Sequence, residues 1–176
     1  PIAAKIRLPD KNFYNVGNWS GAGLFGQQLF NGGGKYITLC EGEFDAAAAY
    51  QMQGSKYACV SVRNGAGGAL KDCKAAYEYL DSFEAIIICF DADEPGNKAS
   101  KEVAELFSGK AAIVKHTGGH KDACDYLVAN DIKGFTAAFW AAEKFVPDGI
   151  INGASLWDEV NRPVEKSAVM YPWENL

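Results

Sequence analysis

The chain has 176 residues, of which 48% are apolar, and its formal net charge is −5. This length and composition suit one ordinary globular domain and exclude an intrinsically disordered protein. No apolar run approaches the roughly 18 to 20 residues that span a bilayer, and the N-terminus lacks the apolar stretch of a secretory signal, so we expect a soluble intracellular protein without membrane partners.

The charge is unevenly distributed along the chain. Residues 1–40 carry four basic residues against one acidic residue, a net +3, whereas residues 41–110 carry seven against twelve, a net −5. A basic N-terminal segment joined to an acidic body suits a protein that binds phosphates with one part and metal ions with another. Ordinary surface variation also produces charge differences of this size.

The five cysteines form no CxxC pair, and three of them lie in or beside apolar runs. Their spacing excludes a zinc knuckle, and their odd number fits reduced, mostly buried thiols better than a disulfide framework. We therefore expect no zinc in this chain.

The first 35 residues mix short alternating stretches with turn residues and include the glycine-rich run "GAGLFGQQLFNGGGK". This pattern predicts a small, partly antiparallel N-terminal subdomain ahead of the main domain. Its aromatic residues Phe13, Tyr14 and Trp19 lie near Lys11 in the sequence, an arrangement that suits either stacking on nucleic-acid bases or packing within the subdomain.

From Tyr36 onward, strand patterns alternate with helical patterns. We predict strands at residues 36–41, 57–62, 85–90 and 111–115, and helices at residues 43–53, 69–80, 95–107, 122–129 and 135–144. Strands and helices that alternate with short connections predict an α/β fold of βαβ units, with a mainly parallel sheet and helices on both faces. The strands are almost continuously apolar, as expected where both faces of a sheet are covered.

After Val146 the sequence contains three prolines and no long periodic run. It predicts a linker with one short helix near residues 155–161. The expected division is an N-terminal subdomain over residues 1–35, an α/β domain over residues 36–146 and a linker over residues 147–176.

Acidic residues follow the carboxyl ends of three predicted strands, where open α/β sheets bind their ligands. Glu41 ends the first strand, Asp91 and Asp93 end the third, and Asp122 follows the fourth. Aspartates two residues apart on extended backbone point in the same direction, so both can face one ion. Carboxylate oxygens suit Mg²⁺ or Mn²⁺, which leave coordination positions for substrate phosphates.

A second interpretation of Asp91 and Asp93 needs no metal ion. Both precede Pro95 at a predicted helix start, where aspartates commonly act as caps and turn formers. Glu41 at an equivalent strand end, directly before Gly42, favours the metal site, because like charges crowded at one edge repel each other unless a cation neutralises them.

The run "RNGAGG", residues 63–68, lies between a predicted strand and a predicted helix. Its backbone N–H groups could cradle a phosphate with Arg63 as a further contact, or the run could be a plain turn. It lacks the spacing of a dinucleotide-binding motif, and the chain contains no Walker A loop.

The stretches "CEGEFDAAAA", "IIICFDADEPGNKA" and "KDACDYL" resemble the three signature stretches of the TOPRIM fold. The flanking stretches "KIRLPDKNFYNVGN", "LFGQQLF" and "VPDGIINGASL" resemble the primase half of the bifunctional phage primase–helicases, a family related to the mitochondrial helicase Twinkle. The resemblance extends from about Ala4 to Leu156. It implies a Rossmann-like TOPRIM domain behind the small basic subdomain.

That family makes short RNA primers on single-stranded DNA. The resemblance therefore implies metal-dependent nucleotidyl transfer from ribonucleoside triphosphates, with Mg²⁺ or Mn²⁺, two ions in the usual arrangement, as cofactor. It implies the helicase domain of a parent chain, or its ring, as a partner, and a phage protein acting in the host cytoplasm at the replication fork. The zinc module of such proteins needs paired cysteines, and the motor needs a Walker A loop. This sequence contains neither, so we interpret the chain as the polymerase core of a longer protein.

The resemblance also assigns roles to individual residues. Glu41 would be a metal-site glutamate and general base, Asp91 and Asp93 would bind the catalytic metals, and Asp122 would complete the acidic cluster. Asp45 matches a supporting acid of the family. Where many relatives have an acid or an amide two residues after the last aspartate, this chain has Cys124. The residues expected to bind nucleic acid or nucleotides are Lys5, Arg7, Lys11, Arg63 and Lys121.

Three other functions share part of this pattern. A phosphatase of the haloacid-dehalogenase type also has Asp-x-Asp after an apolar strand, but a Thr or Val normally stands where this chain has Pro95. A TOPRIM nuclease needs the same acids and cuts DNA. A catalytically silent scaffold of a replicative helicase has no reason to keep four crowded acids.

Overall fold

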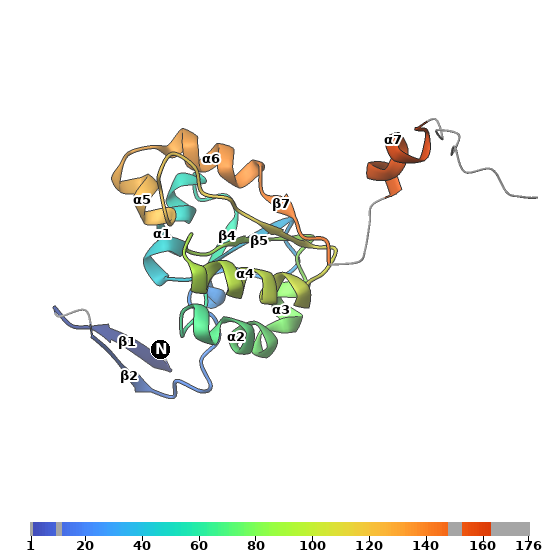
Figure 1. Ribbon diagram of the computed structural model, residues 1–176. Helices are drawn as coiled ribbons and strands as arrows, with labels where there is room; N and C mark the ends of the chain where they lie inside the picture. The colour runs from blue at the N-terminus through green and yellow to red at the C-terminus, as the bar shows by residue number, and fades with distance from the viewer. Residues whose placement is uncertain (1, 10–11, 148–152, 163–176) are drawn as a thin grey trace, which may run out of the picture. The chain divides into compact units, whose positions relative to one another are not determined.

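The computed structural model describes residues 2–9, 12–147 and 153–162. The chain divides into two compact units between Phe145 and Val146. The first unit contains a two-stranded antiparallel sheet and a five-stranded, mainly parallel sheet with helices on both faces (Figure 1). The predicted α/β fold class is therefore confirmed.

The N-terminal segment forms a β-hairpin, as its alternating pattern predicts. Strands β1 (Ala3–Arg7) and β2 (Phe13–Gly17) pair in antiparallel register. Every side chain of β2 is exposed, with Phe13 at 52% and Tyr14 at 50%. These two aromatic rings therefore do not form a core within the hairpin.

The large sheet has the strand order β4-β3-β5-β6-β7 and is parallel except where β7 joins it. Parallel register pairs Cys40 with Ser61 on one side and with Cys89 on the other, so the carboxyl ends of three neighbouring strands lie level. This register brings together the residues that follow those strands. The strands are β3 (Tyr36–Cys40), β4 (Ala58–Ser61), β5 (Ala85–Cys89), β6 (Ala111–Ile113) and β7 (Glu143–Lys144).

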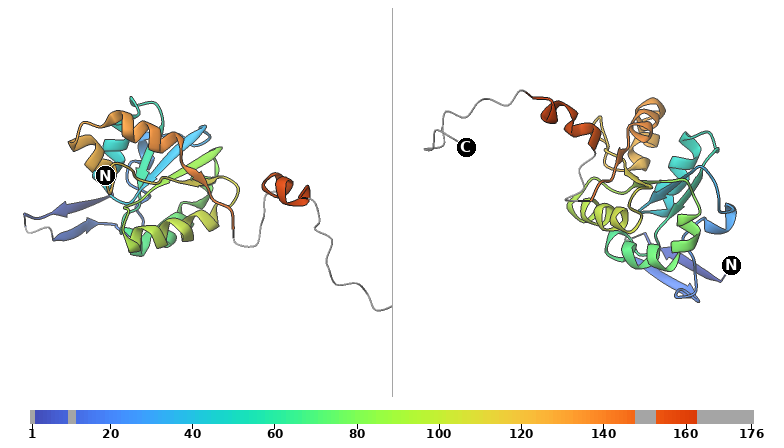
Figure 2. Two further views of the ribbon diagram at one scale, coloured as in Figure 1. Left: turned by 45° about the horizontal axis from the view of Figure 1, so that its top comes forward. Right: turned by 90° about the vertical axis from the view of Figure 1, so that its right-hand side faces the viewer.

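Alternate residues of each central strand pack against opposite helical layers, which explains the continuous apolar character of the strands. In β5, Ile86 and Ile88 belong to one core cluster, and Ile87 and Cys89 belong to the other. The two layers lie on opposite faces of the sheet (Figures 1 and 2). The first layer contains α2 (Ala69–Ala75), α3 (Tyr77–Asp81) and α4 (Glu94–Leu106), and the second contains α1 (Glu43–Met52), α5 (Ala123–Val128) and α6 (Ile132–Trp140).

The helix predicted over residues 69–80 is instead two helices. Helix α2 ends before Ala76, whose φ of −106° and ψ of 20° lie outside the helical range, and α3 follows directly. The break contains neither proline nor glycine, so the local sequence gives no sign of it. Tertiary packing accounts for it, since Cys73 and Leu80 on the two sides are both fully buried in one core.

The helix predicted over residues 135–144 begins and ends earlier than expected. Asp131 caps it, because its side chain accepts a hydrogen bond from the Gly134 N–H at 2.9 Å. Glu143 and Lys144 form strand β7, and Glu143 also pairs with Lys115 at 2.7 Å. A two-residue edge strand carries no periodic pattern, which is why the sequence does not predict it.

The described residues of the second unit form a 3₁₀ helix, η3 (Gly153–Leu156), and α7 (Trp157–Val160), close to the short helix expected near residues 155–161. The side chains of Trp157 and Val160 are exposed. Among the described residues, no helix combines the length and the apolar character needed to cross a bilayer.

Candidate active site

The carboxylates predicted from the strand ends lie together at one edge of the large sheet. Glu41 follows β3 and Asp91 follows β5, and these two strands are direct neighbours. Burial, followed by the negative charges of Glu41, Asp45, Asp122 and Asp93, raises the pKa of Asp91 to about 7. Five acidic side chains therefore share one electrostatic environment. The pKa is raised for Asp91 and Asp45, and more strongly for Asp91.

Glu41 is fixed through one of its two carboxylate oxygens. Its Oε1 accepts a hydrogen bond from the backbone N–H of Ala66 at 3.0 Å. Its Oε2 is buried and has no hydrogen-bond partner among the described residues. The glycine-rich loop over residues 63–68, which could have bound a phosphate, thus binds the carboxylate of Glu41 instead. The buried Oε2, which has no hydrogen-bond partner among the described residues, is suited to bind a cation.

Asp93 and Asp122 are both helix caps. Asp93 Oδ1 accepts from the Gly96 N–H at 2.7 Å at the start of α4, and Asp122 Oδ1 accepts from the Asp125 N–H at 2.7 Å at the start of α5. The capping interpretation of Asp93 is therefore correct. It does not compete with cation binding, because the second oxygen of each carboxylate has no hydrogen-bond partner within the described part of the chain.

Two glycines allow the acids to approach the backbone closely. A Cβ at Gly42 would lie 2.6 Å from Asp45 Oδ2, and a Cβ at Gly96 would collide with the carbonyl oxygen of Asp91. Any larger residue at either position would displace an acid of the cluster.

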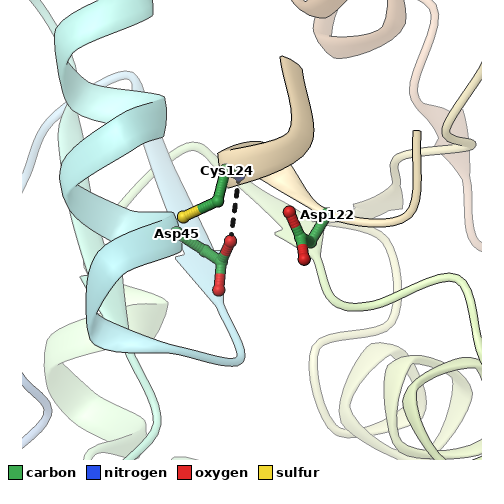
Figure 3. Close-up of side chains that lie close together, drawn as sticks. All are labelled: Asp45, Asp122 and Cys124. Carbon is green, nitrogen blue, oxygen red and sulfur yellow. Dashed lines mark hydrogen bonds between the residues drawn. The ribbon is translucent and has the colours of Figure 1, made fainter. Parts of the chain in front are cut away.

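Asp45, Asp122 and Cys124 form the tightest group of possible metal ligands among the described residues. One ligand atom from each lies within 4.8 Å of the others, and Figure 3 shows Asp45 on α1 facing the start of α5. The Cys124 N–H donates to Asp45 Oδ1 at 3.1 Å. Burial, together with the hydrogen bond to Asp45 and its charge, raises the pKa of Cys124 to about 12, so this thiol is neutral at neutral pH.

The surroundings of Asp45 raise the pKa of its carboxyl above the ordinary value. Burial raises its pKa, its hydrogen bonds with Cys124 lower it, and the charge of Asp122 raises it again, with a net increase. A cluster of carboxylates in which the pKa values of Asp91 and Asp45 are raised, and in which one buried oxygen of Glu41 has no partner among the described residues, fits a hard divalent cation such as Mg²⁺ or Mn²⁺.

The predicted nucleic-acid contacts on the N-terminal hairpin lie beside this cluster. Lys5 Nζ pairs with Glu43 Oε1 at 2.8 Å and also donates to the Arg63 carbonyl oxygen at 3.3 Å, which ties β1 to the first turn of α1. Arg7 is exposed and lies 5.7 Å from the centre of the Phe13 ring. Lys121, next to Asp122, is exposed, and Lys11 lies outside the described residues.

Arg63 is buried in the body of the domain, and the structure does not support its predicted contact with phosphate. Its exposed fraction is 9%, and its guanidinium pairs with Asp72 at 2.6 Å. Two further guanidinium bonds go to the carbonyl oxygens of Trp19 and Ala22. The group thus fixes the segment after the hairpin to the end of β4. The sequence hides this role, because the partner Asp72 lies on the following helix in a position typical of an exposed acid.

A cavity of about 1360 Å³ opens between the hairpin, residues 19–32 and the first turn of α1. Three exposed rings line it, Phe13 at 52%, Phe25 at 47% and Phe44 at 65%. Arg7 and the Lys5–Glu43 pair also line it. Glu43 and Phe44 stand between Glu41 and Asp45 in the sequence, so the cavity borders the acidic cluster.

The profile of the Toprim-like family matches residues 38–127 of the chain. Among characterised proteins, the chain is 39% identical over 160 residues to a DNA helicase/primase of Enterobacteria phage T3. The match covers 90% of this chain but 28% of the phage T3 protein, so the chain spans less than a third of that relative.

Two solved structures from bacteriophage T7 are similar. The primase fragment of the T7 primase–helicase protein has a TM-score of 0.73 and 38% identity, and the match covers 79% of this chain and 57% of that one. A structure of the T7 lagging-strand DNA polymerase interacting with primase domains, which are bound to an RNA/DNA hybrid and dTTP, gives a TM-score of 0.73 and 39% identity, covering 80% of this chain and 71% of that one.

Proposed function

The chain belongs to the Toprim-like family, and from the primases among its relatives we propose that it is the primer-synthesising core of a primase–helicase. In this role it joins ribonucleoside triphosphates into short RNA on a single-stranded DNA template. The observation that carries the proposal is the carboxylate cluster at the ends of β3 and β5, in which a buried oxygen of Glu41 has no partner among the described residues.

The residues proposed to hold the cofactor are Glu41, Asp91, Asp93 and Asp122, with Asp45 as a supporting acid. Glu41, Asp93 and Asp122 each use one carboxylate oxygen to accept a backbone hydrogen bond and keep the other free of hydrogen bonds among the described residues. Two bound ions of Mg²⁺ or Mn²⁺ would lower the pKa of the attacking 3′-hydroxyl and offset the charge that develops on the phosphate oxygens.

The chain itself supplies a carboxylate, that of Glu41, in a fixed position. The Ala66 N–H holds Glu41 through Oε1, which leaves Oε2 either to bind a cation or to accept the proton of the attacking hydroxyl as a general base. Asp91, whose pKa is about 7, is partly protonated without a cation and would release that proton when a cation binds.

The groove beside the cluster is proposed to bind the nucleic acid and the incoming nucleotide. Exposed phenylalanine rings suit base stacking, and exposed basic side chains suit phosphates. Arg7 and Lys121 are exposed, whereas Lys5 must exchange Glu43 for a phosphate. The T7 primase domains bind an RNA/DNA hybrid and dTTP, and we propose ligands of the same class here.

We further propose that the parent protein carries a helicase domain, as the phage T3 relative is a DNA helicase/primase, and that it acts in the host cytoplasm at the replication fork. No observation favours a TOPRIM nuclease or a silent scaffold over primer synthesis.

The direct test is extension of a short RNA annealed to single-stranded DNA, with ribonucleotides and Mg²⁺. We expect the unaltered chain to add nucleotides and Asp93→Asn to lose this activity, because asparagine keeps the helix cap and removes the charge. Glu102→Gln, which changes a partly exposed acid on α4, is the matched control and should retain activity. Nicking of circular DNA with Mg²⁺ and no extension would instead assign the chain as a nuclease.

A further inference from the structure

The loop between β6 and α5 contains a histidine that the proposed reaction does not use. His116 Nε2 lies 2.9 Å from the carbonyl oxygen of Phe90, the residue directly before Asp91. A carbonyl oxygen can only accept, so Nε2 carries the proton and donates it. His116 therefore fixes the backbone where β5 leads into the acidic cluster.

The imidazole ring is held from its other side as well. It packs against Tyr126, with 5.8 Å between ring centres. The Tyr126 hydroxyl accepts from the Thr117 N–H at 2.7 Å and donates to the Thr117 carbonyl oxygen at 3.2 Å. Tyr126 is fully buried on α5, the helix that Asp122 caps. The ring thus connects the end of β5 to the helix that carries Asp122.

One further bond completes this connection. The Ala92 N–H donates to the Lys121 carbonyl oxygen at 2.8 Å. The last ladder bond between β5 and β6 runs from the Val114 N–H to the Ile88 carbonyl oxygen at 2.9 Å. Beyond this bond, the backbone is fixed on both sides of Asp91. His116 bonds to the carbonyl oxygen of Phe90 before it, and the N–H of Ala92 after it bonds to Lys121.

We propose that His116 is a positioning residue that sets the spacing between Asp91 and Asp122, and through it the affinity of the cluster for a divalent cation. The inference rests on the proposed function only in taking the cluster to bind a cation. His116 contacts neither carboxylate among the hydrogen bonds of the described residues, so its effect passes through the Phe90 carbonyl and the loop. Residues that orient ligands in this way typically change metal affinity by about 10- to 100-fold.

The test measures the affinity of the whole chain for Mn²⁺. Electron paramagnetic resonance detects the Mn²⁺ that remains free in solution. His116→Leu keeps the approximate volume and removes the donor, and we expect its affinity to fall about tenfold. His116→Gln retains an N–H donor and should recover most of that loss. Tyr79→Phe is the matched control: it deletes another side-chain bond to a phenylalanine carbonyl, Tyr79 Oη to Phe30 O at 3.3 Å, and should leave the affinity unchanged.

Wild-type affinity in a folded His116→Leu protein would overturn the inference, with folding checked by circular dichroism and cooperative urea unfolding. An equal loss in the Leu, Gln and Tyr79→Phe variants would also overturn it, since that result reports general destabilisation. If His116→Leu does not fold, His116→Asn replaces it, because the shorter amide cannot span to Phe90. Absence of Mn²⁺ binding by the unaltered chain, or undiminished binding by Asp91→Asn, would overturn the proposed function as well.

Discussion

Glu41, Asp93 and Asp122 each give one carboxylate oxygen to a backbone N–H and leave the other without a partner in the described chain. The bonded oxygen fixes the side chain, and at the two helix starts the same bond satisfies a donor that the helix cannot. A residue can therefore be a cap and a cation ligand at once, so the two interpretations of the strand-end aspartates are compatible.

Asp91 should make the stability of the metal-free protein depend on pH. Its pKa in the folded protein is about 7, chiefly because of burial and then four neighbouring carboxylates, against about 3.9 in an unfolded chain. Between these values the folded state holds a proton that the unfolded state has lost, so stability falls as pH rises through this window. Asp91→Asn should flatten that fall and unfold at higher urea concentration above pH 7, measured in EDTA from pH 5 to 8. Identical pH profiles would show that Asp91 ionises normally.

The buried ion pair of Arg63 and Asp72 should be a major stabilising contact. Asp72 is 1% exposed, and Arg63 needs it as the acceptor for its guanidinium. Asp72→Asn should lower the free energy of unfolding by about 3 to 5 kcal/mol, because it leaves a buried charge without a partner. Asp81→Asn is the control: its pair with Lys110 is partly exposed, and its loss should cost less than about 1 kcal/mol. Urea unfolding of both variants measures the difference, and similar costs would contradict the structural role of Arg63.

The helices and strands that can be predicted from the sequence are those with a local hydrophobic pattern. The strands over residues 36–41 and 85–90 are recognisable because both of their faces are buried, and the acids after them are placed by parallel register alone. The break at Ala76 and the strand Glu143–Lys144 are not predictable, since one follows from tertiary packing and the other is too short for periodicity. The burial of Arg63 is not predictable from the sequence either, because it depends on Asp72, a partner on the next helix.

The hairpin should supply much of the electrostatic attraction for nucleic acid. The triple variant Lys5→Ala, Arg7→Ala and Lys11→Ala should bind single-stranded DNA more weakly and with a flatter dependence on salt, because fewer counterions are released. Fluorescence anisotropy across a salt series measures this slope. Lys74→Ala, Lys98→Ala and Lys101→Ala remove the same charge from exposed helical positions and serve as the control. If the hairpin variant keeps the salt dependence of the unaltered chain, this face does not bind nucleic acid.

The whole molecule consists of a first unit that ends at Phe145 and a C-terminal unit that begins at Val146. The described part of the second unit exposes Trp157 and Val160, while Met170 and Trp173 lie outside the described residues. An apolar, non-periodic segment of this kind suits a connection to another domain, and we propose the helicase domain of the parent protein as that domain.

Deleting residues 162–176 should therefore leave primer extension by this chain unchanged and cost little stability. In the parent protein, the same deletion should uncouple primer synthesis from the helicase. Melting temperature and extension rate of the truncated chain measure the first expectation. A large fall in either would show that the segment belongs to the first unit.

We propose that the acids at the ends of β3 and β5 bind the cation on which nucleotide addition depends. The most direct measurement is the rate of nucleotide addition to an annealed RNA as Mg²⁺ is titrated, for the unaltered chain and for Glu41→Gln. Glutamine keeps an oxygen for the Ala66 N–H and loses the charge. We expect a saturable Mg²⁺ dependence for the unaltered chain and a rate at least about 100-fold lower for Glu41→Gln at every Mg²⁺ concentration. Addition by Glu41→Gln at the unaltered rate, or addition that persists in EDTA, would contradict this proposal.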